Sequence, residues 1–404
     1  MFSILKKSEK KKLRKNNVGD DNKNILFISW DNIATGGGFI SMVDLINILR
    51  EKYNLNIFVI VPYNGTGSDL LNEFNIPFKI IRSWSWMVPI SERNKITTKF
   101  KNIIKKIFNA RAINKISKFI IENDIDLVHI NTTYSYVGAK SAIRTNVPFV
   151  WHLREFVEQH QNNTMWDRNE GNNLINSSNK IIVISESLKD KYVDVFDSDK
   201  LVRIYDGIDV KKFYNPHKVI FNSDKLIFMI TGFIVPPKGQ IDLAKACAKL
   251  YRTGFDNFEV WFFGSWENGT RREIEDIFSS VNMGNYKFFG YKKNIEEYYS
   301  CADISFTCSE YEAFGRTTVE AMLSGNLVIG ADSACTKELI GKNHGLLYQL
   351  HNIDDLYEKI IFAIENPVLC QNIANNAREF MYKNMTAERN AEKVFEVYSD
   401  VLNL

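Results

Sequence analysis

Short apolar segments recur along the chain, and helical patterns of apolar and polar positions lie between them. The first series covers residues 24–30, 57–61, 127–130, 148–151 and 180–184. The pattern starts again after residue 209, with segments at 226–231, 258–263, 287–289 and 304–307. Strands that alternate with helices predict a parallel, doubly wound sheet. The sequence therefore predicts an α/β protein with two Rossmann-like halves, joined near residues 206–222.

The length supports the same division, because 404 residues exceed what one ordinary core holds. We expect a basic N-terminal arm at 1–23, a first domain at 24–205, a second domain at 206–385 and a C-terminal helix at 386–404. That last helix is amphipathic. Its apolar stripe consists of Ala391, Val394, Phe395, Tyr398 and Leu402.

Composition is that of a soluble globular protein, with 45% hydrophobic and 25% charged residues. No apolar run reaches the length of a membrane span, and the lysine-rich start does not read as a secretory signal. The cysteines are odd in number and form no close pair. We therefore expect reduced thiols, buried as small core residues, in a cytoplasmic protein. They are Cys247, Cys301, Cys308, Cys335 and Cys370.

Charge is unevenly distributed. Residues 1–205 carry 30 Lys and Arg against 21 Asp and Glu, whereas residues 206–404 carry 21 against 27. The basic half predicts an anionic partner: membrane lipid, a lipid-phosphate acceptor or nucleic acid. Nucleic acid fits worst, because no binding motif accompanies the charge.

The stretch 95–118 is a basic amphipathic helix by its pattern. It fits either an anionic membrane surface or an ordinary domain helix with a solvated basic face. Its apolar positions are Phe100, Ile103, Ile104, Ile107 and Phe108, and its charges include Lys99, Lys101, Lys105, Lys106 and Arg111. Just before it, Trp84 and Trp86 suit a membrane interface or a sugar acceptor.

The most informative motif is SEYEAFGRTTVEAM at residues 309–322. It follows a buried strand and leads into a helix that we expect from Thr317 to Ser324. Ligands bind at the carboxyl ends of strands in open α/β sheets, where helix N-termini favour anions. Glu312 and Glu320 are misplaced at such an anion-friendly edge unless they contact sugar hydroxyls. Carboxylates can accept hydrogen bonds from two neighbouring hydroxyls.

This segment resembles the glutamate-pair signature of retaining GT-B glycosyltransferases of the family-4 type. The resemblance implies two Rossmann-like domains facing across a cleft, with the last helix crossing back to the first domain. It assigns Glu312 to the donor sugar and Glu320 to the nucleoside ribose. The donor-binding positions that it implies are Gly37, Gly38, Gly290, Tyr291, Ala313, Phe314, Gly315, Arg316, Thr317 and Glu320, and the catalytic ones are Glu312, Lys238 and His152.

The segment 231–240 carries a departure from the family pattern. Lys238-Gly239 matches the family's Lys-Gly, whose cation stabilises the leaving diphosphate. Phe233 stands where the family has an arginine. Either Lys238 acts with less help, or Arg316 supplies the second charge.

The glycine-rich loop at residues 35–39 follows the first strand, and Gly37 and Gly38 would meet the donor diphosphate and acceptor. Taken alone, the loop also fits a tight strand–helix turn. A dehydrogenase is rejected, because residue 41 is Ser and no acid closes the second strand. Gly290 and Tyr291 end a strand where the family holds the nucleotide base; the alternative is a plain strand end.

In the first half, His152 leaves a strand end and matches the family's histidine near the donor sugar. His129 lies within an apolar strand, and we interpret it as a core residue. Arg154 pairs with Glu155 or meets an anionic acceptor. Glu338 matches a family glutamate that follows two glycines, which are Ala334-Cys335 here.

The resemblance implies a retaining, metal-independent hexosyltransferase. It would move a sugar from a nucleoside diphosphate to an acceptor hydroxyl in surface-polysaccharide or glycolipid synthesis. No cofactor is expected, and no cluster of residues has metal-ligand spacing. We expect a glycan or lipid-linked acceptor, a cytoplasmic location with peripheral membrane contact, and no nucleic acid. The alternatives are a non-catalytic GT-B subunit that binds a glycan or a partner protein, and a sugar-nucleotide epimerase, which the Glu312–Glu320 segment does not resemble.

Overall fold

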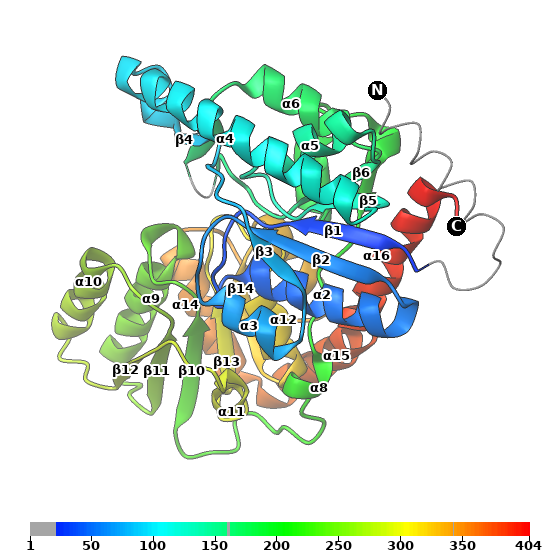
Figure 1. Ribbon diagram of the computed structural model, residues 1–404. Helices are drawn as coiled ribbons and strands as arrows, with labels where there is room; N and C mark the ends of the chain where they lie inside the picture. Colours follow the sequence, from blue (N-terminus) through cyan, green and yellow to red (C-terminus); the bar gives the residue numbers. More distant parts are fainter. Residues whose placement is uncertain (1–21, 160–161, 342) are drawn as a thin grey trace, which may run out of the picture.

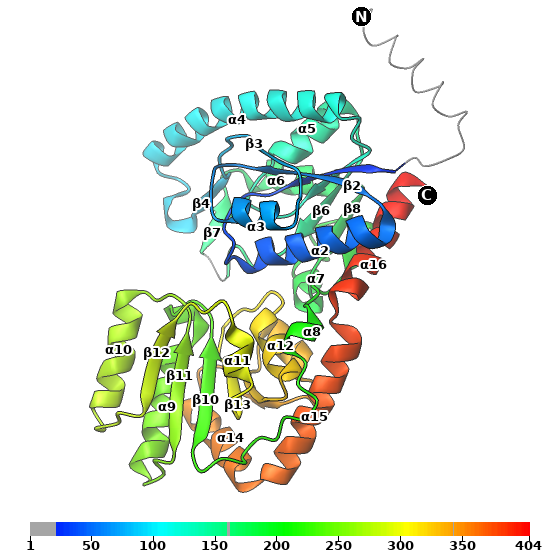
Figure 2. The same cartoon turned by 60° about the horizontal axis from the view of Figure 1, so that its bottom comes forward.

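The computed structural model describes residues 22–159, 162–341 and 343–404. The basic arm predicted at 1–23 therefore lies almost wholly outside the described residues. Two parallel sheets, each with its own helices, form two α/β domains that lie one above the other in Figures 1 and 2. The prediction of a doubly wound α/β protein is confirmed.

The first sheet has the order β3-β2-β1-β5-β6-β8-β9 and is parallel throughout. Its strands are β1 (Asn24–Ile28), β2 (Asn56–Val61), β3 (Phe78–Ile80), β5 (Leu127–Ile130), β6 (Phe149–Leu153), β8 (Lys180–Val183) and β9 (Leu201–Arg203). Its helices are α2 (Gly37–Tyr53), α3 (Gly67–Glu73), α4 (Ile96–Glu122), α5 (Val137–Thr145), α6 (Arg168–Asn176) and α7 (Glu186–Tyr192). A small antiparallel pair, β4 (Met87–Pro89) and β7 (Asn163–Met165), lies beside this sheet.

The second sheet has the order β12-β11-β10-β13-β14-β15. Its strands are β10 (Leu226–Thr231), β11 (Phe258–Phe263), β12 (Tyr286–Gly290), β13 (Ile304–Thr307), β14 (Leu327–Ala331) and β15 (Leu346–Tyr348). Its helices include α8 (Val210–Phe213), α9 (Gln240–Arg252), α10 (Asn268–Ser279), α11 (Ile295–Tyr299), α12 (Arg316–Leu323), α13 (Ala334–Ile340), α14 (Ile353–Glu365) and α15 (Pro367–Asn384). Short 3₁₀ turns lie at η1 (Ile90–Glu92), η2 (Ser198–Lys200) and η3 (Pro236–Lys238).

The last helix, α16 (Ala387–Leu402), returns to the first domain and packs on α2, as predicted (Figure 2). Ala391, Val394 and Tyr398 are fully buried in the core formed by β1, β2 and α2. The ring of Phe395 stacks on Tyr53 with centroids 4.0 Å apart. The apolar stripe predicted from the sequence is therefore the surface by which the C-terminal helix packs on the first domain.

Two segments cross between the domains, and they pair with each other. Ile208 N donates to Met385 O at 2.9 Å, and Ala387 N donates to Ile208 O at 3.1 Å. A side chain at Gly207 would approach the Ala387 Cα to 2.4 Å, so only glycine permits this contact.

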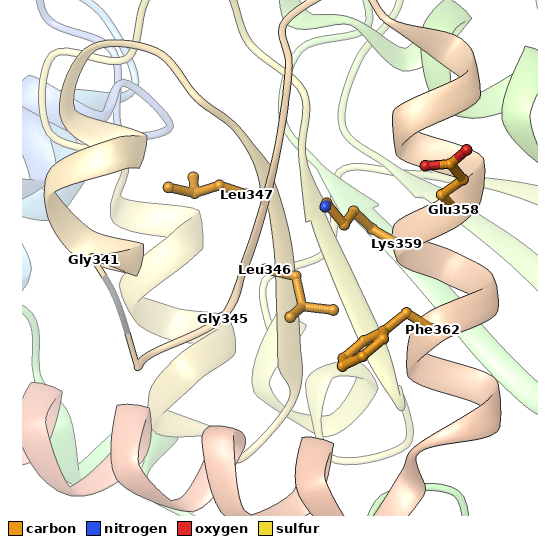
Figure 3. Close-up of a pocket in the computed structure, with 7 residues that line it drawn as sticks. All are labelled: Gly341, Gly345, Leu346, Leu347, Glu358, Lys359 and Phe362. Atoms are coloured by element: carbon orange, nitrogen blue, oxygen red, sulfur yellow. The ribbon is translucent and has the colours of Figure 1, made fainter.

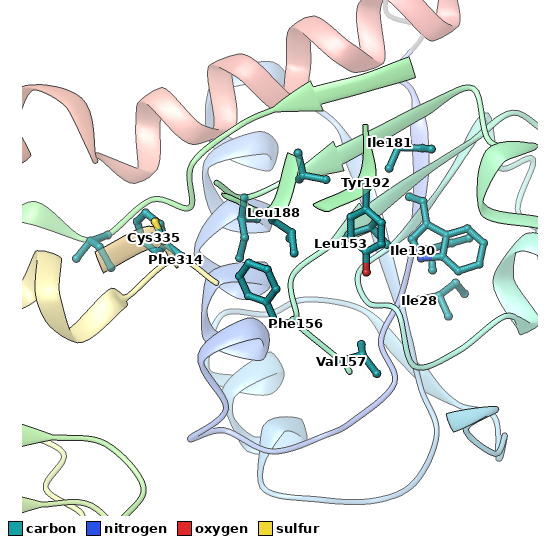
Figure 4. Packing of buried hydrophobic residues seen from close by; sticks show 14 of the residues in the cluster. Ile28, Ile130, Leu153, Phe156, Val157, Ile181, Leu188, Tyr192, Phe314 and Cys335 are labelled. Atoms are coloured by element: carbon teal, nitrogen blue, oxygen red, sulfur yellow. The ribbon is translucent and has the colours of Figure 1, made fainter. Parts of the chain in front are cut away.

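An apolar cluster continues across the domain boundary. Phe156 and Leu188 of the first domain belong to the same buried cluster as Phe314 and Cys335 of the second (Figure 4). All five cysteines are free thiols, but Cys301 is exposed, so the prediction of five core thiols is wrong at that position.

Candidate active site

A lysine and a glutamate from two neighbouring loops of the second domain meet at the carboxyl ends of β10 and β13. Lys238 ends η3, and its Nζ forms an ion pair with the Oε1 of Glu312. Ser309 Oγ donates to the same carboxylate oxygen at 2.8 Å. Both charged side chains are largely buried, at 20% and 15% exposed. The sequence predicted both residues at this edge, and the structure brings them into contact.

Two glycines permit this arrangement. Gly239 has φ +71°, and a side chain there would overlap the Cys308 carbonyl oxygen at 2.2 Å. Gly315, with φ +87°, precedes α12 in the left-handed conformation that favours glycine. The Lys238 loop can therefore lie directly against the end of β13, and the 309–315 loop can turn into α12.

The N-terminus of α12 makes no side-chain capping hydrogen bond. The amides of Thr318 and Val319 both donate to Gly315 O, at 3.0 and 3.2 Å. The amides of Arg316 and Thr317 come earlier in the helix, among those that lack intrahelical acceptors. Such amides, together with the helix dipole, favour a phosphate group.

Arg316 reaches across the domain boundary. Its Nη1 donates to Ser41 Oγ at 3.0 Å and to the Gly207 carbonyl at 3.3 Å, and lies 3.6 Å from Asp44 Oδ2. Its Nε lies 3.7 Å from Glu320 Oε1. The guanidinium is therefore placed between the glycine-loop helix α2 and the glutamate predicted to hold ribose.

Glu320 lies on α12 and is only 9% exposed. Burial is the main cause that raises its pKa to about 7; nearby Arg316 and Lys212 act in the opposite direction. Burial disfavours the charged form of a carboxylate, so a buried glutamate on a helix is unusual unless it has a functional role. Ionisable groups with pKa values shifted in this way are concentrated at functional sites.

The glycine loop faces the same place from the first domain. The first helical residue of α2 is Gly37, and its N-cap, Gly36, makes no side-chain hydrogen bond. A methyl group at Gly37 would lie 3.6 Å from Arg316 Cδ, and one at Gly38 would lie 3.6 Å from Arg154 Cδ. The two domains thus place two helix N-termini in a common region, with Arg316 and Arg154 beside the glycine loop.

His152 is fully buried at the end of β6. Its Nδ1 lies 3.2 Å from Arg154 Nη2 and 3.2 Å from His129 Nε2, and its Nε2 has no partner among the described residues. Burial is the main cause that lowers the pKa of both histidines well below the usual range, and neighbouring Arg154 adds to it. Both rings are therefore neutral near pH 7.

The predicted ion pair between Arg154 and Glu155 does not form, and a contact of Arg154 with an anionic acceptor stays a prediction. Arg154 is 5% exposed, and its guanidinium forms a buried ion pair with Asp206 of the crossing segment, whereas only its backbone amide reaches the Glu155 carboxylate, at 3.3 Å. The Glu155 carboxylate instead accepts hydrogen bonds from Thr132 and Thr133. Nothing in the sequence indicates that Arg154 pairs with Asp206 and not with Glu155, which follows it in the chain.

Gly290 has φ +69°, and its carbonyl accepts from Gly264 N at 2.9 Å. Tyr291 and Phe233 are 58% and 53% exposed. Phe314 is buried and packs near Tyr205, so its side chain belongs to the core. Ala313 is partly buried beside it.

Glu338 has a role that the sequence did not reveal. Its carboxylate accepts from the amides of Glu186 and Ser187 at 2.9 and 2.6 Å, from the Ser187 hydroxyl, and from Tyr205 OH at 3.1 Å. It therefore caps α7 of the opposite domain. No sequence signal could have paired residues 151 positions apart.

Two other features lie apart from these residues. A pocket of about 430 Å³ opens beside β15 and α14, and none of the predicted site residues lines it (Figure 3). Among the described residues, no group of His, Cys, Asp and Glu is placed to hold a metal ion. Within the same part of the chain, no helix is long and apolar enough to cross a membrane.

Two family models match the chain. Residues 59–212 match Glycosyltransferase Family 4, and residues 212–380 match Glycosyl transferases group 1. The chain belongs to the family-4-type glycosyltransferases. The predicted resemblance is confirmed, and the enzyme class follows from it.

This glycosyltransferase is similar to an uncharacterised glycosyltransferase of Methanocaldococcus jannaschii, with 27% identity over 71% of the chain and 80% of the relative. It is also similar to the poly(ribitol-phosphate) α-N-acetylglucosaminyltransferase of Staphylococcus aureus, with 26% identity over 55% of the chain. That match spans only 44% of the Staphylococcus enzyme.

Among solved structures, Anabaena HepE in complex with UDP superimposes with a TM-score of 0.78 at 20% identity, covering 93% of this chain and all of HepE. This similarity confirms the GT-B fold.

Proposed function

We propose that this glycosyltransferase transfers a hexose from a nucleoside diphosphate to an acceptor hydroxyl with retention of configuration and without a catalytic metal. The observation that carries the proposal is the Lys238–Glu312 ion pair beside the uncapped N-terminus of α12. A cation, two helix amides and a carboxylate are the groups that a leaving diphosphate and a sugar with free hydroxyls require.

Each residue then has a defined task. Lys238 and the α12 amides neutralise the charge that grows on the leaving phosphate as the glycosidic bond breaks. Glu312 leaves its contact with Lys238 and orients the donor sugar through its hydroxyls. Glu320 accepts hydrogen bonds from the ribose. The acceptor attacks from the same face, and the leaving phosphate oxygen takes its proton.

For the donor, we propose a uridine diphosphate sugar. HepE has been crystallised with UDP and with UDP-glucose, and it shares the fold of this chain. Gly290 ends β12 and Tyr291 follows it, at the edge where the base would lie, and the exposed Tyr291 ring is available for stacking.

The proposal is tested by incubating the protein with UDP-, GDP-, dTDP- and ADP-sugars and measuring release of free nucleotide without an acceptor. We expect slow hydrolysis of a UDP-sugar, and UDP at about 100 times its dissociation constant should stabilise the fold by roughly 2.7 kcal/mol. Hydrolysis lost in Lys238→Ala but retained in a surface-lysine control, Lys245→Ala, assigns the activity to this site. Silence with every donor would instead favour the non-catalytic subunit, for which the exposed Phe233 in place of an arginine is the one structural argument.

For the acceptor, we propose a lipid-linked glycan reached through α4. Six large apolar residues form an exposed stripe along the first half of this helix, each 43–76% exposed. We call this the apolar stripe of α4: Ile96, Phe100, Ile103, Ile104, Ile107 and Phe108. The buried side of the same turns is polar, with Thr98, Asn102 and Asn109 facing inward. In its first turns α4 therefore has the reverse of the usual arrangement, because its apolar residues face solvent and its polar residues face the protein.

Four lysines flank this stripe: Lys99, Lys101, Lys105 and Lys106. We call them the basic flank of α4. An exposed apolar face with basic flanks fits an anionic membrane surface. In Figures 1 and 2, α4 lies on the side of the first domain that faces away from the second. Of the two tryptophans predicted to share this role, Trp84 is 39% exposed, but Trp86 is buried and donates to Thr133 O, so that prediction is wrong for Trp86.

A further inference from the structure

A chain of buried polar side chains leads from the last helix to His152. Tyr398 OH on α16 lies 2.7 Å from His129 Nδ1, and His129 Nε2 lies 3.2 Å from His152 Nδ1. Tyr398, His129 and His152 are all fully buried. From the sequence we interpreted His129 as a core residue, and nothing in the reaction proposed above uses it or Tyr398.

The chemistry of the partners fixes the direction of these hydrogen bonds. An arginine side chain only donates, so His152 Nδ1, which contacts Arg154 Nη2, is an acceptor. A neutral histidine carries one ring proton, so the proton of His152 lies on Nε2. His129 must then donate from its own Nε2 to His152 Nδ1. Its Nδ1 is left as an acceptor, and Tyr398 donates its hydroxyl proton to it.

We propose that Tyr398 and His129 are positioning residues that, together with Arg154, hold His152 in the neutral Nε2–H tautomer. His152 then offers a single free group, an N–H donor, which is buried and has no partner among the described residues. Within the transfer reaction proposed above, on which this role rests, its ligand is an oxygen atom of the donor sugar. The same tautomer prevents His152 from acting as a general base, because Nε2 has no lone pair to accept a proton and Nδ1 already receives two donors.

The origin of Tyr398 has a consequence for the architecture. The chain of α16 comes directly from α15 of the second domain and then packs on the first. Arg154, the other donor to His152, is anchored by Asp206 on the second crossing segment. The histidine of the first domain is therefore oriented by both segments that connect it to the donor-binding domain.

The tautomers can be measured directly by two-bond ¹H–¹⁵N NMR, with the His152 and His129 signals assigned from His152→Gln and His129→Gln. In the wild-type protein, we expect both rings to be neutral and protonated on Nε2. A protonated Nδ1 on His152 would overturn the proposal. Because this measurement needs no substrate, it separates the tautomer assignment from failure of the proposed function.

Loss of a hydrogen bond from the Tyr398–His129–His152 chain should lower turnover. In Tyr398→Phe, the Nδ1 of His129 loses its donor and the ring is held by one hydrogen bond fewer, so kcat should fall about five-fold, the factor that one neutral hydrogen bond supports, while KM for the donor changes less than two-fold. His129→Gln keeps an amide donor near the Nε2 position and should retain more activity than His129→Leu. The matched control is Tyr348→Phe, which removes an equally buried hydroxyl from the edge strand β15 and should leave kcat unchanged. Equal kinetics for Tyr398→Phe and this control would overturn the positioning role.

Discussion

Replacement of Glu320 by glutamine should make the protein more stable and less able to bind nucleotide. Burial raises the Glu320 pKa from 4.5 to about 7 in the folded protein. At 1.36 kcal/mol per pKa unit, this difference corresponds to about 3 kcal/mol. Below about pH 4.5 the side chain is protonated in both states, and the folded state has its full stability. As the pH rises to about 7, the unfolded chain loses its proton first, and this stability is lost.

Glutamine does not titrate, so the free energy of unfolding of Glu320→Gln does not fall in this way as the pH rises. Urea unfolding at pH 5 and pH 8 should show a variant whose advantage over the wild type grows by about 2–3 kcal/mol between the two pH values. Exposed Glu388→Gln on α16 controls for the charge change, and surface substitutions of this kind stay within about 0.5 kcal/mol. A stability difference that does not depend on pH would refute the assignment of a strained, buried carboxylate.

The same substitution removes the proposed partner of the ribose. A hydrogen bond to a charged group contributes about 1.5–3 kcal/mol, so UDP affinity at pH 8 should fall roughly ten- to hundred-fold in calorimetry. Stabilisation with unchanged affinity would place the ribose elsewhere. Gain in stability with loss of binding is the expected signature of a residue kept for function.

Three further predictions concern the other groups. Lys238→Ala should lower kcat more than it raises the donor KM, because the leaving-group charge is largest in the transition state; wild-type turnover would transfer that role to Arg316. Glu338→Gln should weaken the cap on α7 and lower the melting temperature by a few degrees, whereas no change would show that Ser187 and its neighbours find other partners. Changing the basic flank of α4 to glutamate should abolish low-salt sedimentation with phosphatidylglycerol vesicles and leave UDP affinity intact, since each basic residue contributes about 1 kcal/mol near an anionic surface. If the wild-type protein ignores such vesicles, α4 is not a membrane surface. Four exposed lysines of the second domain, changed in the same way, are the charge-matched control: Lys245, Lys287, Lys293 and Lys383.

Local sequence patterns were sufficient for the central strands and for the loops that follow them. The predicted strand at 127–130 is β5 itself, and the positions of Lys238 and Glu312 at one sheet edge follow from the rule that parallel strands end together. Short edge strands such as β9 and β15 were missed, because three residues carry too little periodicity.

Long-range pairing could not be read from the sequence. The contacts of Arg316 with Ser41 and of Tyr398 with His129 join residues 275 and 269 positions apart. A basic amphipathic pattern also does not reveal which face of α4 packs inward. Only the structure shows that the polar face is the buried one in its first turns.

The paired crossing segments decide how the two domains can move. Because Ile208 is hydrogen-bonded to both Met385 and Ala387, the two connections form one short ribbon and not two independent tethers. A ribbon resists sliding and stretching but permits bending about its own axis. The domains should therefore open and close by rotation about this single hinge, with Gly207 and Arg316 beside the pivot and Glu338 at the edge that parts. A side chain at position 207 would overlap Ala387 and disturb the hinge without touching a substrate.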